Sequence, residues 1–253
     1  MQKKTIAMLT KQKYTFQVRA YEIDPSGKLT MANLCNYLQE AAGQHAHALK
    51  VSSPQLMENG ITWVLARLHV QMRKMPNWQE NVTIETWPAQ IDRLFAVRDF
   101  RIFVDNEEIG VATSAWVLMD LKSRRPLRRF PAEITDVHPE KPVRALNDSF
   151  KKLQPVETAE NPTELPIRAD DIDINSHVNN AVFIALLEDN LPESRRNKHQ
   201  LIEIEIEFRG EAFQGDTLIG RRGVDGHQNE FYHSLTRREN NAEVIRARTV
   251  YSQ

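Results

Sequence analysis

The sequence predicts an α+β protein built from two copies of one unit, in each of which an antiparallel sheet encloses one apolar helix. Two pairs of similar segments support this prediction. The segment VRAYEID at 18–24 recurs as IRADDID at 167–173, and VQMRKMPNWQENV at 70–82 resembles IEFRGEAFQGDTL at 206–218. The pairs occur in the same order, which favours an internal duplication. Their offsets, 149 and 136 positions, imply a loop 13 residues shorter in the second copy.

The first copy combines one helical pattern with several strand patterns. A helical stripe is formed by Leu34, Leu38, Ala41 and His45. Along residues 64–73, the even-numbered positions are all apolar and most of the odd-numbered positions are polar, and this alternation predicts a strand. Further strands are expected at 82–87, 95–105 and 110–120.

The second copy repeats this order. Its helix, expected over 180–187, is apolar almost all round and must therefore be enclosed. Apolar and charged residues alternate along the next segment, with Ile202, Ile204, Ile206 and Phe208 between Glu203, Glu205, Glu207 and Arg209. This alternation predicts a half-buried strand with one solvent-facing side. Later strands are expected near 216–224, 230–237 and 243–251.

A proline-rich stretch separates the two copies. It contains Pro139, Pro142, Pro155, Pro162 and Pro166. Proline fixes φ and removes a backbone donor, so this stretch is typical of a connecting segment. We therefore expect a first unit at 1–137, a linker at 138–166 and a second unit at 167–253.

Composition excludes several classes of protein. Lys and Arg total 33 and Asp and Glu total 34, so the chain lacks the basic excess of a nucleic-acid binder. The longest apolar run, 181–187, is far shorter than the roughly 20 residues of a membrane-spanning helix. The N-terminal residues lack the pattern of a secretory signal, and Cys35 is the only cysteine. These features predict a cytoplasmic protein.

The densest group of polar residues lies between Asp171 and Asn180, where the second apolar helix is expected to begin. The start of a helix offers backbone N–H groups that suit a developing oxyanion. The side chains of Asp173, Asn175 and His177 would point one way if this turn is extended. Ordinary roles are the alternative, namely capping, turn formation or exposure on the surface.

The two copies differ at this group of polar residues. Asp173, Asn175, His177 and Glu211 of the second copy correspond to Asp24, Ser26, Lys28 and Met75 of the first. If both copies were active, both would hold the complete set. The simpler hypothesis is one active copy and one structural copy.

The segment DIDINSHVNNAVFIALLED resembles the D-x-N-x-H-V-N-N signature of acyl-acyl-carrier-protein (acyl-ACP) thioesterases, and the resemblance spans about residues 14–251. It implies a tandem double hot-dog fold and hydrolysis of fatty acyl-ACP to free fatty acid, which ends chain elongation. It implies no cofactor and no metal. The partner would be an acyl carrier protein bearing a phosphopantetheine-linked acyl chain, and the protein would be a monomer or a homodimer.

The resemblance implies catalytic roles for Asp173, Asn175, His177 and Glu211. We expect Glu211 and His177 to hold and deprotonate a water molecule, and Asn175 to orient the substrate or water. Asp173 would orient its neighbours, and a backbone N–H near 178–180 would face the carbonyl oxygen. Which carboxylate is the base stays open. Some relatives carry a cysteine after the glutamate, but this chain has Ala212 there.

The resemblance also implies that the first copy forms the acyl-chain pocket, with candidate walls at 34–42 and 63–68. A basic run, formed by Lys122, Arg124, Arg125, Arg128 and Arg129, either docks an acidic carrier or is a solvated loop. Three alternative functions stay open: an acyl-CoA thioesterase, a non-catalytic acyl-binding hot-dog protein and a hot-dog dehydratase.

Overall fold

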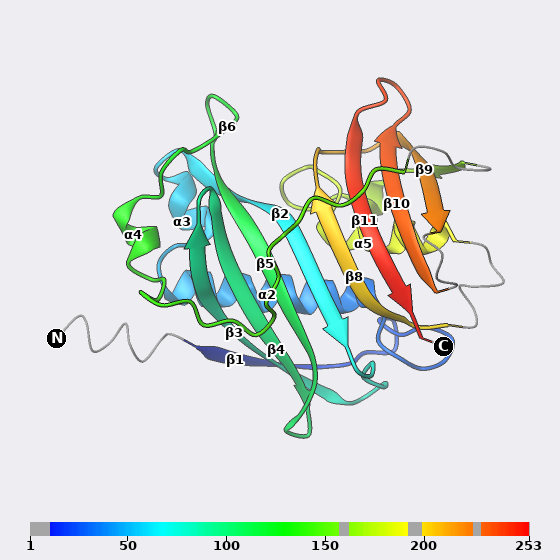
Figure 1. Ribbon diagram of the computed structural model, residues 1–253, viewed down its shortest axis with the longest axis horizontal. Helices are drawn as coiled ribbons and strands as arrows, with labels where there is room; N and C mark the ends of the chain where they lie inside the picture. The colour runs from blue at the N-terminus through cyan, green and yellow to red at the C-terminus, as the bar shows by residue number, and fades with distance from the viewer. Residues whose placement is uncertain (1–10, 157–161, 192–198, 225–228, 253) are drawn as a thin grey trace. The chain divides into compact units, whose positions relative to one another are not determined.

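The computed structural model describes residues 11–156, 162–191, 199–224 and 229–252. The chain divides into two compact units. The first comprises residues 1–29, 36–68 and 72–149, and the second comprises 30–35, 69–71 and 150–253. Figure 1 shows the elements of both units. No helix among the described residues is long and apolar enough to cross a membrane.

The first unit is an antiparallel sheet with one long helix. Its strands lie in the order β1 (Gln12–Gln17), β3 (Asn81–Asp92), β4 (Phe95–Val104), β5 (Glu107–Asp120) and β2 (Ile61–Met72), of which residues 69–71 are grouped with the second unit. The strand β6 (Arg125–Pro126) pairs with β5. The helices are α2 (Met31–Ala48), α3 (Ser53–Met57) and α4 (Ala132–Thr135). In Figure 1, α2 runs across one face of this sheet.

Burial confirms the helical stripe expected in the first copy. Leu34, Leu38, Ala41 and His45 are all at most 1% exposed. Three of these side chains are apolar, and their burial stabilises the unit by roughly 25 cal/mol for each Å² of apolar surface removed from water.

The second unit repeats the strand order of the first. Its strands lie in the order β7 (Thr163–Pro166), β9 (Thr217–Val224), β10 (Glu230–Arg237), β11 (Glu243–Tyr251) and β8 (Leu201–Phe208). The helix α5 (Asn180–Asp189) follows a short 3₁₀ turn, η1 (Ala169–Asp171). Five apolar side chains of α5 are buried, as expected for an enclosed helix: Ala181, Phe183, Ile184, Leu186 and Leu187.

The turn before the helix has the same backbone bonds in both copies. The Asp24 N–H donates to the Lys28 carbonyl at 2.8 Å, and the Asp173 N–H donates to the His177 carbonyl at 2.8 Å. An isolated bridge closes each turn, and the left-handed residue occupies the same position in both, Gly27 with φ 83° and Ser176 with φ 63°. The register of the internal repeat therefore holds in three dimensions.

The outer side of β8 differs from the prediction. The sequence predicts a solvent-facing row of charges, but Glu207 is only 1% exposed. The Leu153 N–H donates to the Glu207 carboxylate at 2.7 Å, and Arg246 Nη1 donates to the Leu153 carbonyl at 3.0 Å. The segment around Leu153 thus covers this side of the strand. The expectation of a fully wet side is wrong because a segment about 50 residues earlier supplies the cover.

Candidate active site

The segment that carries the predicted site residues is a tight turn and not an extended strand. Ile172 and Val178 form an isolated bridge, so the chain reverses between them. The Ser176 N–H donates to the Asp173 carbonyl at 3.0 Å, and Ser176 has a left-handed φ of 63°. The turn is therefore not extended, so the condition under which alternate side chains would share one direction is not met.

Asp173 and Asn175 form one pair within this turn. Asp173 Oδ1 accepts the Asn175 backbone N–H at 2.8 Å, and Asp173 Oδ2 accepts Asn175 Nδ2 at 3.2 Å. The carboxylate thus fixes both the backbone and the amide of its neighbour. The prediction that Asp173 orients a neighbouring residue is consistent with this contact, while its role in catalysis stays a prediction.

His177 and Glu211 form a second pair. His177 Nε2 lies 3.5 Å from Glu211 Oε2. The His177 side chain is 29% exposed and that of Glu211 is 42% exposed, so solvent or a substrate can reach both groups. Groups at this distance are looser than in a working proton relay, and such contacts often tighten only when substrate binds.

Backbone bonds bring the two pairs together. Glu211 follows the end of β8, and the adjacent Ala212 carbonyl accepts the Val178 N–H at 2.9 Å. This bond holds the segment after β8 against the turn. The Asp173 N–H donates to the His177 carbonyl, which links the two pairs. The structure therefore gathers all four predicted residues around one turn of the second unit.

Two of the backbone donors expected to face an oxyanion are already engaged. The Val178 N–H donates to the Ala212 carbonyl, and the Asn179 N–H donates to the Asp171 carbonyl, both at 2.9 Å. Both N–H groups therefore have a partner within the protein before substrate binds. That a backbone N–H near 178–180 faces the carbonyl oxygen stays a prediction.

The corresponding turn of the first unit lacks the catalytic groups. Lys28 and Ser26 replace the histidine and the asparagine, and Met75, which corresponds to Glu211, is only 3% exposed. Asp24 keeps its structural role, because its Oδ1 accepts the backbone N–H groups of Ser26 and Lys28. The aspartate therefore shapes the turn in both copies, and the histidine and glutamate distinguish the second.

Phe213 contacts His177 but was not singled out from the sequence. The centroids of the two rings lie 5.2 Å apart at an interplanar angle of 65°. The internal repeat contained a signal for it, because the first copy has Asn77 at the corresponding position.

A polar cleft of about 370 Å³ lies in the second unit, formed by the segment before β9 and the end of β10. It is lined by Gly215, Asp216, Thr217, Arg237, Arg238 and Glu239. None of the four predicted site residues lines this cleft. Its arginines are paired with carboxylates, Arg237 with Asp216 and Arg238 with Glu164. The cleft therefore has no excess of positive charge to attract an anion.

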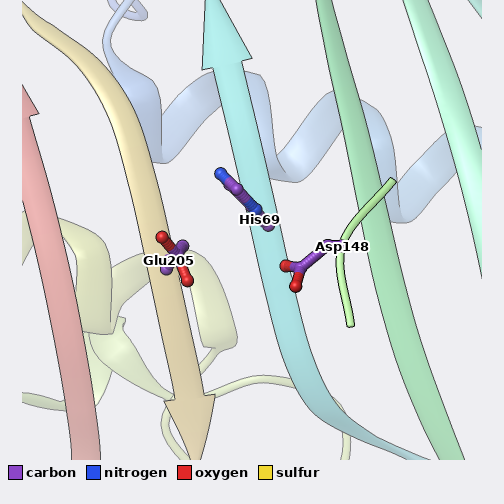
Figure 2. A group of neighbouring side chains, drawn as sticks. All are labelled: His69, Asp148 and Glu205. Atoms are coloured by element: carbon purple, nitrogen blue, oxygen red, sulfur yellow. The ribbon is translucent and has the colours of Figure 1, made fainter. Parts of the chain in front are cut away.

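Two other groups of reactive side chains among the described residues, Cys35 and the pair His69 and Glu205, are not assigned a role in the reaction. Cys35 is buried, and its burial raises the pKa of the thiol to about 12, so the thiolate needed for attack does not form near neutrality. Figure 2 shows His69 on β2 and Glu205 on β8, both counted in the second unit. Glu205 accepts Arg248 Nη1 at 2.8 Å. Asp148, also drawn, belongs to the first unit, and we assign no metal to His69 and Glu205.

Comparisons with known proteins cover nearly the whole chain. Residues 9–137 match the family model of the acyl-ACP thioesterase N-terminal domain, and residues 155–253 match that of the C-terminal domain. Oleoyl-acyl carrier protein thioesterase 2 of Arabidopsis thaliana is 30% identical over 94% of this chain and 75% of its own length. The oleoyl-acyl carrier protein thioesterase of Coriandrum sativum is 31% identical over 81% of this chain, which spans 60% of that relative's length.

Two solved structures share the fold. The acyl-ACP thioesterase of Bacteroides thetaiotaomicron is 27% identical with a TM-score of 0.82, over 96% of this chain and 98% of that one. The 12:0-ACP thioesterase of Umbellularia californica is 26% identical with a TM-score of 0.84, over 96% of this chain and 97% of that one. The predicted α+β class with two hot-dog units is confirmed.

Proposed function

Because the chain belongs to the acyl-ACP thioesterase family, we propose that it hydrolyses the thioester of a fatty acyl-acyl carrier protein, releasing free fatty acid and ending chain elongation. The single observation that carries this proposal for the site is the proximity of His177 Nε2 and Glu211 Oε2, 3.5 Å apart, in the copy that holds the family motif. The curated relatives named above are thioesterases of acyl carrier proteins, which supports the same substrate class.

In this proposal the His177–Glu211 pair holds one water molecule beside the acyl carbonyl. One member of the pair takes a proton from the water as its oxygen attacks the carbonyl carbon. The carbon–sulfur bond then breaks, and the carrier thiolate leaves and is protonated. The net reaction consumes one water and yields a carboxylic acid and a thiol. This route needs neither a metal nor a redox cofactor.

Asp173 and Asn175 prepare the turn for this chemistry. The bonds from the Asn175 N–H and Nδ2 to the Asp173 carboxylate fix the Asn175 amide. A fixed amide orients the substrate or the water without losing conformational entropy at the reacting step. A backbone N–H at residues 178–180, where α5 begins, is the proposed donor to the carbonyl oxygen.

We assign different roles to the two copies. The second copy, expected at 167–253, carries catalysis, and the first copy, expected at 1–137, forms the acyl-chain pocket. The stretch 138–166 connects them and ends in β7, which pairs with β9 of the second unit. The first copy has Lys28 and Met75 at the positions where the second copy has a histidine and a glutamate, which supports this division.

The acyl carrier protein is the proposed partner, and a cytoplasmic monomer or homodimer is the proposed state. Every residue of the basic run of the first unit is exposed, as a docking surface for an acidic carrier requires; the run consists of Lys122, Arg124, Arg125, Arg128 and Arg129.

If the side chains of this basic run attract the carrier, KM for the carrier-bound substrate rises with ionic strength, because salt screens exposed charges.

Thiol release by the purified protein tests the proposed function. We expect release from acyl-ACP substrates, with a higher kcat/KM than from acyl-CoA of the same chain length. A series of chain lengths on each carrier identifies the preferred acyl group. Higher kcat/KM on acyl-CoA would replace the carrier protein with coenzyme A as the substrate. Acyl binding without thiol release from either would contradict the enzyme itself.

A further inference from the structure

We infer that Phe213 is a positioning residue that holds the His177 ring in its working orientation. Arg237 and Asp216 contact Phe213 and stabilise its position. This inference rests on the proposed function, since it concerns the same histidine. It adds two side chains, Phe213 and Arg237, to which neither the motif nor the family resemblance assigned a role.

The contacts form a continuous row of side chains within the second unit. The His177 and Phe213 rings meet edge to face, with centroids 5.2 Å apart. The Arg237 guanidinium carbon lies 5.4 Å from the centroid of the Phe213 ring. Edge-to-face ring pairs and cations placed near an aromatic ring are both favourable contacts. The Phe213 ring is therefore in contact with both the histidine and a cation.

Asp216 fixes the two supporting residues. Arg237 Nη2 donates to Asp216 Oδ1 at 3.1 Å, and Arg237 Nε lies 3.1 Å from Oδ2 as part of the same ion pair. Asp216 Oδ2 also accepts the Phe213 backbone N–H at 2.9 Å. One carboxylate thus contacts both the backbone of Phe213 and the guanidinium that lies by its ring. A charge-assisted hydrogen bond is stronger than a neutral one, so it supports the position of the guanidinium.

The first copy serves as an internal comparison. Glu80 corresponds to Asp216 and also accepts the backbone N–H of its neighbour Asn77, at 2.8 Å. The carboxylate that caps the loop is therefore part of the common fold. The sheet registers Val82–Val104 and Leu218–Arg237 place Val104 where the second copy has Arg237. Only the copy with the histidine also has the aromatic ring and the arginine.

The position of the Phe213 ring lets it restrict the His177 imidazole. His177 lies on a turn, and its side chain is 29% exposed, so part of the imidazole borders solvent. Phe213 restricts the rotation of the imidazole on one side, while Glu211 faces Nε2. Because small displacements of a catalytic group can cost up to about 100-fold in rate, holding the imidazole raises kcat and leaves substrate affinity nearly unchanged.

The test is a set of Phe213 variants analysed by kinetics and NMR. We expect Phe213→Ala to lower kcat by about 10-fold with KM changed less than about twofold, and Phe213→Tyr to restore most of the rate. Arg237→Gln should lower kcat by less, and it should add nothing in the Phe213→Ala background. Phe213 is 37% exposed, so Phe213→Ala should fold normally. Asn77→Ala, at the corresponding loop of the first copy, is the matched control.

Carbon–proton NMR of the histidine rings provides a readout that needs no turnover. With the His177 signal assigned by its loss in His177→Gln, we expect the ring-current shift from Phe213 to vanish in Phe213→Ala and to persist in Asn77→Ala. An unchanged His177 signal, or an unchanged kcat in Phe213→Ala, would overturn the inference. An inactive wild-type protein would overturn the proposed function instead, and the NMR result would still decide whether Phe213 holds the histidine.

Discussion

His177→Ala lowers kcat/KM for acyl-ACP hydrolysis by at least about 100-fold, the usual scale for a positioned acid–base group. The expected cause is loss of the group that holds the attacking water with Glu211, whose Oε2 lies 3.5 Å from His177 Nε2. The partly exposed histidine contributes little to the core, so the protein should stay folded. Steady-state thiol release with the purified variant measures the effect.

Lys28→Ala is the matched control for this variant. Lys28 occupies the position of His177 in the first copy, in a turn with the same backbone bonds. We expect it to retain wild-type kcat. A His177→Ala variant with nearly wild-type kcat, or an equal loss in both variants, would contradict the assignment of catalysis to the second copy.

The second large effect is expected from Asp173→Asn, which should lower kcat by at least about 100-fold. The Asp173 carboxylate accepts two N–H groups of Asn175, one on each oxygen. An asparagine has one acceptor oxygen, and its amide nitrogen would face the Asn175 Nδ2 donor. The Asn175 amide must then turn away from its present orientation. Thiol-release kinetics together with thermal unfolding separate this effect from a loss of folding.

Asp24→Asn in the first copy makes the same chemical change in the equivalent turn. Asp24 Oδ1 alone accepts the N–H groups of Ser26 and Lys28, and an asparagine oxygen can still accept both. We expect a stability loss on the order of 1 kcal/mol and an unchanged kcat. If Asp173→Asn also left kcat unchanged, Asp173 would have only the structural role that Asp24 has.

Much of the fold follows from local patterns in the sequence. The strand predicted at 230–237 has the bounds of β10, and the helix predicted at 180–187 begins where α5 begins, after the capping residue Asn179. The repeat correctly aligned the two turns, because Asp24 and Asp173 organise the same backbone bonds. Local periodicity and capping are therefore sufficient to locate these elements.

The features that the sequence did not predict depend on residues distant in the chain or on backbone conformation. Glu207 is buried because the segment around Leu153 covers β8, and no pattern within β8 indicates this cover. The turn at Ser176 adopts a left-handed φ without glycine, so its tight shape carries no clear signal. The contact between Phe213 and His177 joins residues 36 positions apart, and only comparison of the copies could have indicated it.

The most direct test of the central claim is a double-mutant cycle on kcat for His177 and Glu211. If both groups hold and deprotonate one water, removing the second after the first costs little more. We therefore predict that His177→Ala/Glu211→Gln is slower than the slower single variant by no more than about threefold. If the fold-loss of kcat in the double variant equals the product of the two single losses, the two groups act independently, and this result would contradict a shared water.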